Sequence, residues 1–113
     1  MAIPSGSGSE VLKRATVHSC SVGWTEVLSG TANHIYTILS IIIMDANGLG
    51  SDVNIAVNDG SNDIHILGTQ TVGKTETFVW NDKFVMEGDD DLDIYSSASG
   101  MDFYISYIDQ DWT

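Results

Sequence analysis

The chain has 113 residues, of which 42% are hydrophobic and 18% are charged, a composition typical of one folded domain rather than of a disordered segment. Its 16 acidic residues outnumber 4 basic ones, and the formal net charge of −12 argues against nucleic-acid binding, which needs clustered Lys and Arg. No apolar run approaches the roughly 18 residues of a membrane-spanning helix, and the single cysteine excludes an intrachain disulfide framework.

The first twelve residues predict a flexible arm. Residues 1–9 are rich in Gly and Ser, contain the only proline, and have the composition of a linker that cannot form a core. In an assembly we expect this arm to become ordered on a partner, with Ile3, Val11 and Leu12 as its anchors. The sequence therefore divides into an arm at residues 1–12 and a folded domain at residues 13–113.

From Lys13 onward the apolar residues recur with a period of two, which predicts β-strands because successive side chains of a strand point to opposite faces. Turn signals separate the runs, and Asn58-Asp59-Gly60-Ser61 is typical of a hairpin. About eight strands are predicted, at residues 13–19, 24–29, 33–44, 52–58, 62–68, 74–80, 83–86 with 91–97, and 101–108. The residues expected to face the core are Val53, Ile55, Val57, Ile94, Phe103 and Ile105.

No window of the sequence has a convincing helical stripe. Short strands at this spacing favour an all-β fold, an antiparallel two-sheet β-sandwich of jelly-roll-like form.

The strand at residues 33–44 is apolar on both faces. Strict alternation assigns one face, the core face, to Ile35, Thr37, Leu39, Ile41 and Ile43. The opposite face then carries His34, Tyr36, Ile38, Ser40, Ile42 and Met44. A sandwich buries one face of each sheet, so this second face predicts either a contact between subunits or a strand that bends between the two sheets. We expect a homo-oligomer whose interface includes His34, Tyr36, Ile38, Ile42 and Met44.

The sequence contains no strong motif for catalysis or metal binding. His18, His34 and His65 lie in three different predicted strands without a ligand spacing, and Cys20 lacks a catalytic signature. The segment that starts at Asp45 begins like a calcium loop, but Leu49 and Ala56 stand where oxygen ligands are required. The acidic segment 87–93 is a cation candidate, although a solvated loop is the favoured interpretation. We therefore predict no catalytic residue, no metal site, no cofactor and no enzymatic activity.

Aromatic residues leave one further class of function open. Sandwich lectins and carbohydrate-binding modules stack sugars on exposed rings, and Trp24 and Trp112 are the aromatic residues expected to be exposed. A glycan-binding module is therefore an alternative prediction.

Three runs of sequence carry a family resemblance: residues 30–44, residues 53–58 and residues 84–99, followed by the closing strand Phe103-Tyr-Ile-Ser-Tyr. Their order of strands and turns, over residues 15–108, resembles small virion proteins of tailed bacteriophages, the decoration or cement proteins and the head- and tail-associated proteins.

The resemblance implies a jelly-roll-like sandwich that binds other virion proteins and has no catalytic residues. It implies first a capsid decoration protein, which binds the major capsid protein on the virion surface, often as a trimer. Such a protein is made in the host cytoplasm. A neck, tail or fibre component of the virion is the alternative that the same resemblance allows.

Overall fold

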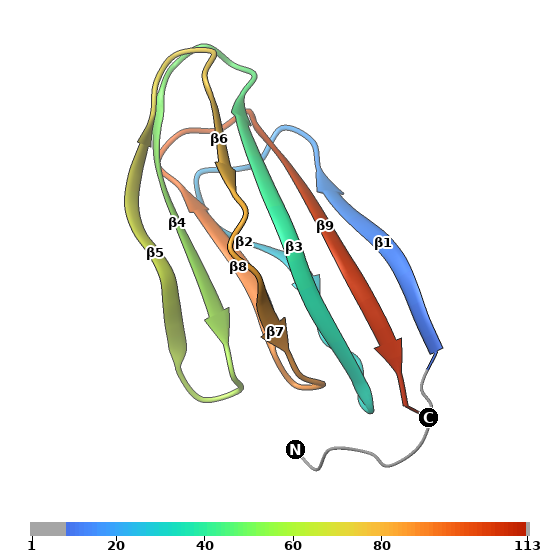
Figure 1. Ribbon diagram of the computed structural model, residues 1–113. Coiled ribbons are helices and arrows are strands. Elements are labelled where there is room, and N and C mark those ends of the chain that lie inside the picture. Colours follow the sequence, from blue (N-terminus) through green and yellow to red (C-terminus); the bar gives the residue numbers. More distant parts are fainter. Residues whose placement is uncertain (1–8, 113) are drawn as a thin grey trace.

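A computed structural model describes residues 9–112. Within this range it contains nine β-strands and no helix (Figure 1). The strands are β1 (Ser9–Val17), β2 (Gly23–Ser29), β3 (His34–Asp45), β4 (Ser51–Asn58), β5 (Asp63–Val72), β6 (Thr77–Trp80), β7 (Phe84–Met86), β8 (Asp91–Ser96) and β9 (Met101–Asp111). Among these residues, no helix is long and apolar enough to cross a membrane.

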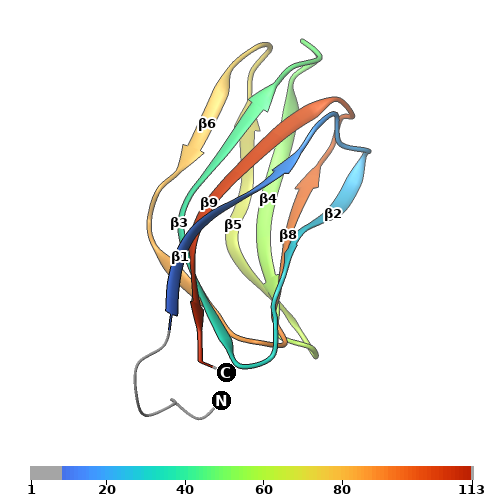
Figure 2. The ribbon, with the colours of Figure 1, turned by 90° about the vertical axis from the view of Figure 1, so that its right-hand side faces the viewer.

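The strands form two antiparallel sheets that face each other (Figure 2). One sheet has the order β1-β9-β3-β6, with β7 also paired to β3, and the other has the order β2-β8-β4-β5. Because β6 and β7 pair with successive parts of β3, they act as one interrupted strand. Counted in that way, the fold has about eight strands in two sheets, the number of a jelly roll. The predicted all-β sandwich is confirmed.

The core lies between the sheets and is built mainly from residues of β3, β4, β8 and β9. The six residues predicted to face it, Val53, Ile55, Val57, Ile94, Phe103 and Ile105, are all buried. Met86, Leu92 and Met101 add further side chains without exposed surface. The period-two pattern therefore identified the inward faces of β4, β8 and β9 correctly.

Strand β3 departs from strict alternation because it contains a β-bulge. Its pairing with β9 shifts between Ile38 and Ser40, so Leu39 is an extra residue on the bulged strand. Before the bulge Tyr36 and Ile38 point into the core, and after it Ile41 and Ile43 do so. One extra residue exchanges the two faces of a strand, since its side chains alternate with a period of two.

The bulge corrects two predictions for β3. Tyr36 and Ile38 were expected to face away from the core, but Ile38 is 0% exposed and Tyr36 is 7% exposed. Ile35 and Leu39, which were expected in the core, are only half-buried. The outward positions predicted for Ile42 and Met44 are correct.

Strand β1 begins at Ser9, four residues before the predicted start of the domain at Lys13. It pairs with β9 from Ser9 opposite Asp111 to Val17 opposite Phe103. Val11 and Leu12, predicted as part of the arm, are exposed residues of this edge strand. Residues 9–12 pair here because the 11-residue β9 offers backbone hydrogen-bonding groups along its whole length. Ile3 lies outside the described residues.

Candidate functional site

The outer side of the five-stranded sheet carries an apolar surface that crosses all its strands. Strand register aligns Thr16, Tyr104, Ile42 and Val79 in one row. A second row consists of Leu12, Ile108, Thr37 and Val85. We define the apolar face as Leu12, Ile42, Met44, Val79, Val85, Tyr104 and Ile108, of which Leu12 is the most exposed at 71%.

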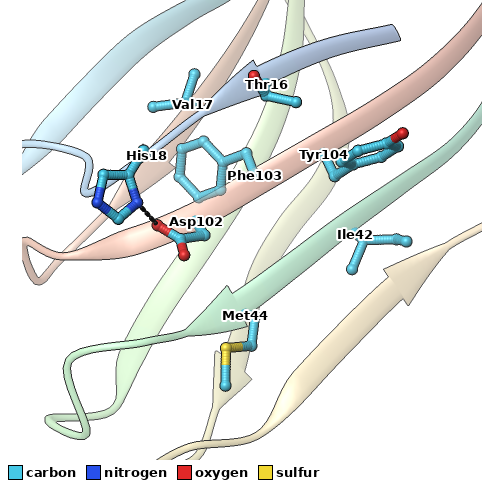
Figure 3. Close-up of a pocket in the computed structure, with 8 residues that line it drawn as sticks. All are labelled: Thr16, Val17, His18, Ile42, Met44, Asp102, Phe103 and Tyr104. Carbon is cyan, nitrogen blue, oxygen red and sulfur yellow. Dashed lines mark hydrogen bonds and ion pairs between the residues drawn. The ribbon is translucent and has the colours of Figure 1, made fainter.

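Two shallow hollows follow this face. The first, of about 270 Å³, lies between β1, β9 and β3, and Figure 3 shows Ile42, Met44 and Tyr104 among the side chains around it. The second, of about 570 Å³, is lined by residues that include Leu12, Leu39 and Tyr104. Because Tyr104 lines both hollows, they are neighbours on one surface.

Charged groups at the hollows are already paired within the domain. The Nδ1 atom of His18 lies 3.1 Å from Oδ1 of Asp102 at one end (Figure 3). The guanidinium of Arg14 lies over the ring of Tyr104, 5.8 Å from its centroid. Lys13 is paired with Asp109. The apolar face therefore offers hydrophobic contact more than free charge.

A buried polar cluster joins β1, β3 and β9 at the other end of the sheet. The Asp109 carboxylate accepts hydrogen bonds of 2.7 Å from Lys13 Nζ and from His34 Nδ1. Burial alone would raise the pKa of Asp109, but these two donors outweigh it and hold the pKa below its ordinary value. The same contact raises the pKa of Lys13.

Two residues predicted for an interface, His34 and Tyr36, make contacts within the domain. His34 holds Asp109 with Nδ1, and its Nε2 lies 3.4 Å from Oδ1 of Asp111. Tyr36 shares a hydrogen bond of 2.7 Å with Thr31 Oγ1, and its ring packs 5.1 Å from that of Tyr107. Both side chains are thus used inside the domain, and neither belongs to the apolar face.

The calcium-like segment at Asp45 is an internal loop anchor. Asp45 has no exposed surface, and its carboxylate accepts hydrogen bonds from the backbone N–H groups of Gly50 (2.7 Å), Gly48 (3.0 Å) and Thr75 (3.2 Å). The Gly50 donor is the main cause of the lowered pKa of Asp45. The two oxygens that a cation would need therefore hold the loops before β4 and β6.

The remaining candidates occupy separate environments. His18 contacts Asp102, His34 contacts Asp109, and His65 lies beside Trp24 on the other sheet. Cys20 is buried, and its Sγ donates to the carbonyl oxygen of Ala98 at 3.7 Å. Within residues 9–112, no group of three His, Cys, Asp or Glu residues is arranged to hold a metal ion.

Comparison with known proteins finds similarity of fold. No protein-family model matches the chain, and neither does any curated protein sequence. A chain from Bacillus endospore appendages, a family of disulfide-linked pili, superposes with a TM-score of 0.58 at 14% identity, over 100% of this chain and 97% of that chain. A chain from the acidic-stable capsid of Helicobacter pylori bacteriophage KHP30 gives 0.55 at 8% identity, over 98% and 92%.

A pentameric capsid protein from metagenomic phage sequences gives a TM-score of 0.45 at 13% identity, over 86% of this chain and 61% of that chain. The expected likeness to phage virion proteins is confirmed for the fold, which the KHP30 capsid chain shares.

Proposed function

We propose that this protein is a non-enzymatic structural protein of a tailed-phage virion, and more specifically a decoration protein that binds the major capsid protein shell. The observation that carries the proposal is the exposed apolar face on a jelly-roll-like sandwich. Its fold similarity to a phage capsid chain supports the same class of role. The resemblance described above suggests decoration in particular.

The side of the molecule that carries the apolar face has room for a specific contact. The molecule measures 48 × 28 × 20 Å, so each of its broad sides exceeds the roughly 800 Å² that each partner buries in a standard interface. Burying one large apolar side chain completely contributes about 1.5–3 kcal/mol. Several such residues on one face therefore favour association, provided that the acidic residues stay at its rim.

We propose that a second copy of the chain covers part of this face, with the trimer taken from the family resemblance. Leu12, Ile42 and Met44 are the contact residues predicted from the sequence that lie on the apolar face. Val11 is exposed next to Leu12 on the same edge strand. We place all four at or near the interface.

Sedimentation velocity of the wild type and Ile42→Glu tests the association. Ile42→Glu puts a charge on the apolar face without entering the core, so it should dissociate the oligomer and leave the circular dichroism of the strands unchanged. Ile64→Glu is the matched control, because Ile64 is an exposed isoleucine on the edge strand of the other sheet. A wild type that stays monomeric at low and high salt, and on particles, would contradict the self-association.

Attachment to the shell is tested with particles that lack the protein. Electron microscopy of particles after addition of the wild type should find it at regular positions on the capsid surface. Residues 1–8, which include Ile3, precede the nine strands of the described residues, so a chain that begins at Ser9 keeps the sequence of every strand. This truncation should therefore keep the unfolding midpoint of the isolated protein but weaken its attachment. Equal attachment with and without these residues would argue against an anchoring arm.

A neck, tail or fibre component is the second candidate, favoured by the pilus chain that superposes along the full length. Disulfide linkage of a whole filament needs at least two cysteines per subunit, and this sequence has only the buried Cys20. A filament of this protein would therefore be held by non-covalent contacts. Negative-stain microscopy distinguishes this candidate, since it predicts filaments or tail labelling instead of regular sites on the shell.

A further inference from the structure

The outer side of the four-stranded sheet differs sharply from the apolar face. Strand register places Glu26, Asp93, Ala56 and His65 in one row across all four strands. Neighbouring rows contain Trp24 beside Tyr95, and Ser29, Asp91, Asn58 and Asp63. We define the acidic face as Trp24, Glu26, Asp63, His65, Asp91, Asp93 and Tyr95. The four strands contain no Lys or Arg at all.

An exposed indole lies on this face, on the edge strand β2. Trp24 is 47% exposed, its ring centroid is 5.5 Å from that of Tyr95, and it stands edge-on to His65 at 6.0 Å. Ala56 pairs with His65, carries only a methyl group and has no exposed surface, so neighbouring side chains cover it. The three rings form an aromatic cluster with interplanar angles of 69° and 56°, in which about half of Trp24 stays accessible to a ligand.

The carboxylates around these three rings have no cationic partner among the described residues. The ion pairs within residues 9–112 have Lys13, His18 and His34 as their basic groups, and these three residues lie on the five-stranded sheet or at its end. A hydrogen bond with Asp91 raises the pKa of Glu26. Burial, followed by the charges of Asp91 and Asp63, raises the pKa of Asp93. In both groups the negative charge of Asp91 is the second cause of the raised pKa, and a bound cation would relieve that repulsion.

We propose that the acidic face binds an arginine-rich segment of a partner protein, with one guanidinium stacked on Trp24 and its neighbours paired with Glu26, Asp91 and Asp93. Arginine suits this face because its planar, weakly hydrated guanidinium stacks on an aromatic ring and also forms bidentate hydrogen bonds with carboxylates. A neutral sugar would also stack on Trp24 but would leave the carboxylates uncompensated. This surface lies on the opposite sheet from the apolar face and is independent of self-association.

Isothermal titration calorimetry of the full chain with a blocked hexa-arginine peptide tests the proposal. The peptide should bind at an ionic strength of about 0.01 M and lose affinity at about 1 M, because salt screens the charge pairs. Trp24→Leu removes the ring and should weaken binding about fivefold, while Trp24→Phe keeps a ring and most of the affinity. Glu26→Gln/Asp93→Asn should weaken binding about tenfold.

The matched control is Glu76→Gln/Asp82→Asn, which removes the same charge from two exposed residues outside the acidic face. Circular dichroism and urea unfolding establish that each variant is folded. Equal weakening by the two double variants would mean that net charge alone attracts the peptide, and would overturn the proposal. Trp24→Leu with wild-type affinity would also overturn it. Binding of a neutral xylo-oligosaccharide without binding of hexa-arginine would assign the face to glycans instead.

Discussion

Truncating two isoleucines of β3 tests which of its faces is the core. Ile38 is fully buried, so Ile38→Ala removes three carbon atoms from between the sheets and leaves a cavity. Substitutions of this kind cost about 2–5 kcal/mol. Ile42 lies four residues further along the same strand but is half-buried on the apolar face. Ile42→Ala removes the same atoms but leaves no enclosed cavity, so we expect the free energy of unfolding to fall by about 1 kcal/mol or less.

Urea unfolding followed by circular dichroism measures both free energies. Protein concentration is kept where the wild type is monomeric, because association would add its own stabilisation. At about 4 °C per kcal/mol for a domain of this size, Ile38→Ala should lower the melting temperature by about 8 °C or more. Sedimentation should respond in the opposite order, since only Ile42 lies on the proposed contact. Equal losses of stability, or a larger loss for Ile42→Ala, would refute the bulged register of β3.

Three other perturbations follow from single contacts. The pKa of Asp109 is lowered in the folded state, so its contribution to stability is present above about pH 4 and is lost as the pH falls through the folded pKa. Urea unfolding between about pH 5 and pH 2 should therefore have a shallower pH dependence in Asp109→Asn than in the wild type. A Cβ atom on Gly30 would lie 2.6 Å from the Glu87 carbonyl oxygen, so Gly30→Ala should lower the free energy of unfolding by about 1–3 kcal/mol. Gly68→Ala is its control, because a Cβ atom there would have no neighbour within 4 Å, and it should change stability by less than about 1 kcal/mol in the same assay. Phe103→Ala should cost about 3–5 kcal/mol in calorimetric unfolding, because the ring is 2% exposed in the core, and a loss below about 1 kcal/mol would contradict that packing.

The candidate surfaces were only partly predictable from the sequence. Ile42 and Met44 were placed on the outer face of β3 correctly, because they follow the bulge and alternate with Ile41 and Ile43. The acidic face was not predicted, since Trp24, Asp93 and His65 belong to three strands that are far apart in the chain. Its signal in the sequence was the absence of Lys and Arg from all four strands.

The sequence by itself determined the fold class and most of the core of this protein. The alternation of apolar and polar residues in β4, β8 and β9, with turn residues between them, is a local property of the chain. It can be recognised without knowing which strands pair with one another. Only the tertiary structure decided the orientation of Ile38, the start of β1 at Ser9 and the meeting of Trp24 with His65. The physical reason is that each of these depends on the register between strands distant in sequence. Register is set by backbone pairing and packing across the sheet, so a single bulge can reverse what the local pattern predicts.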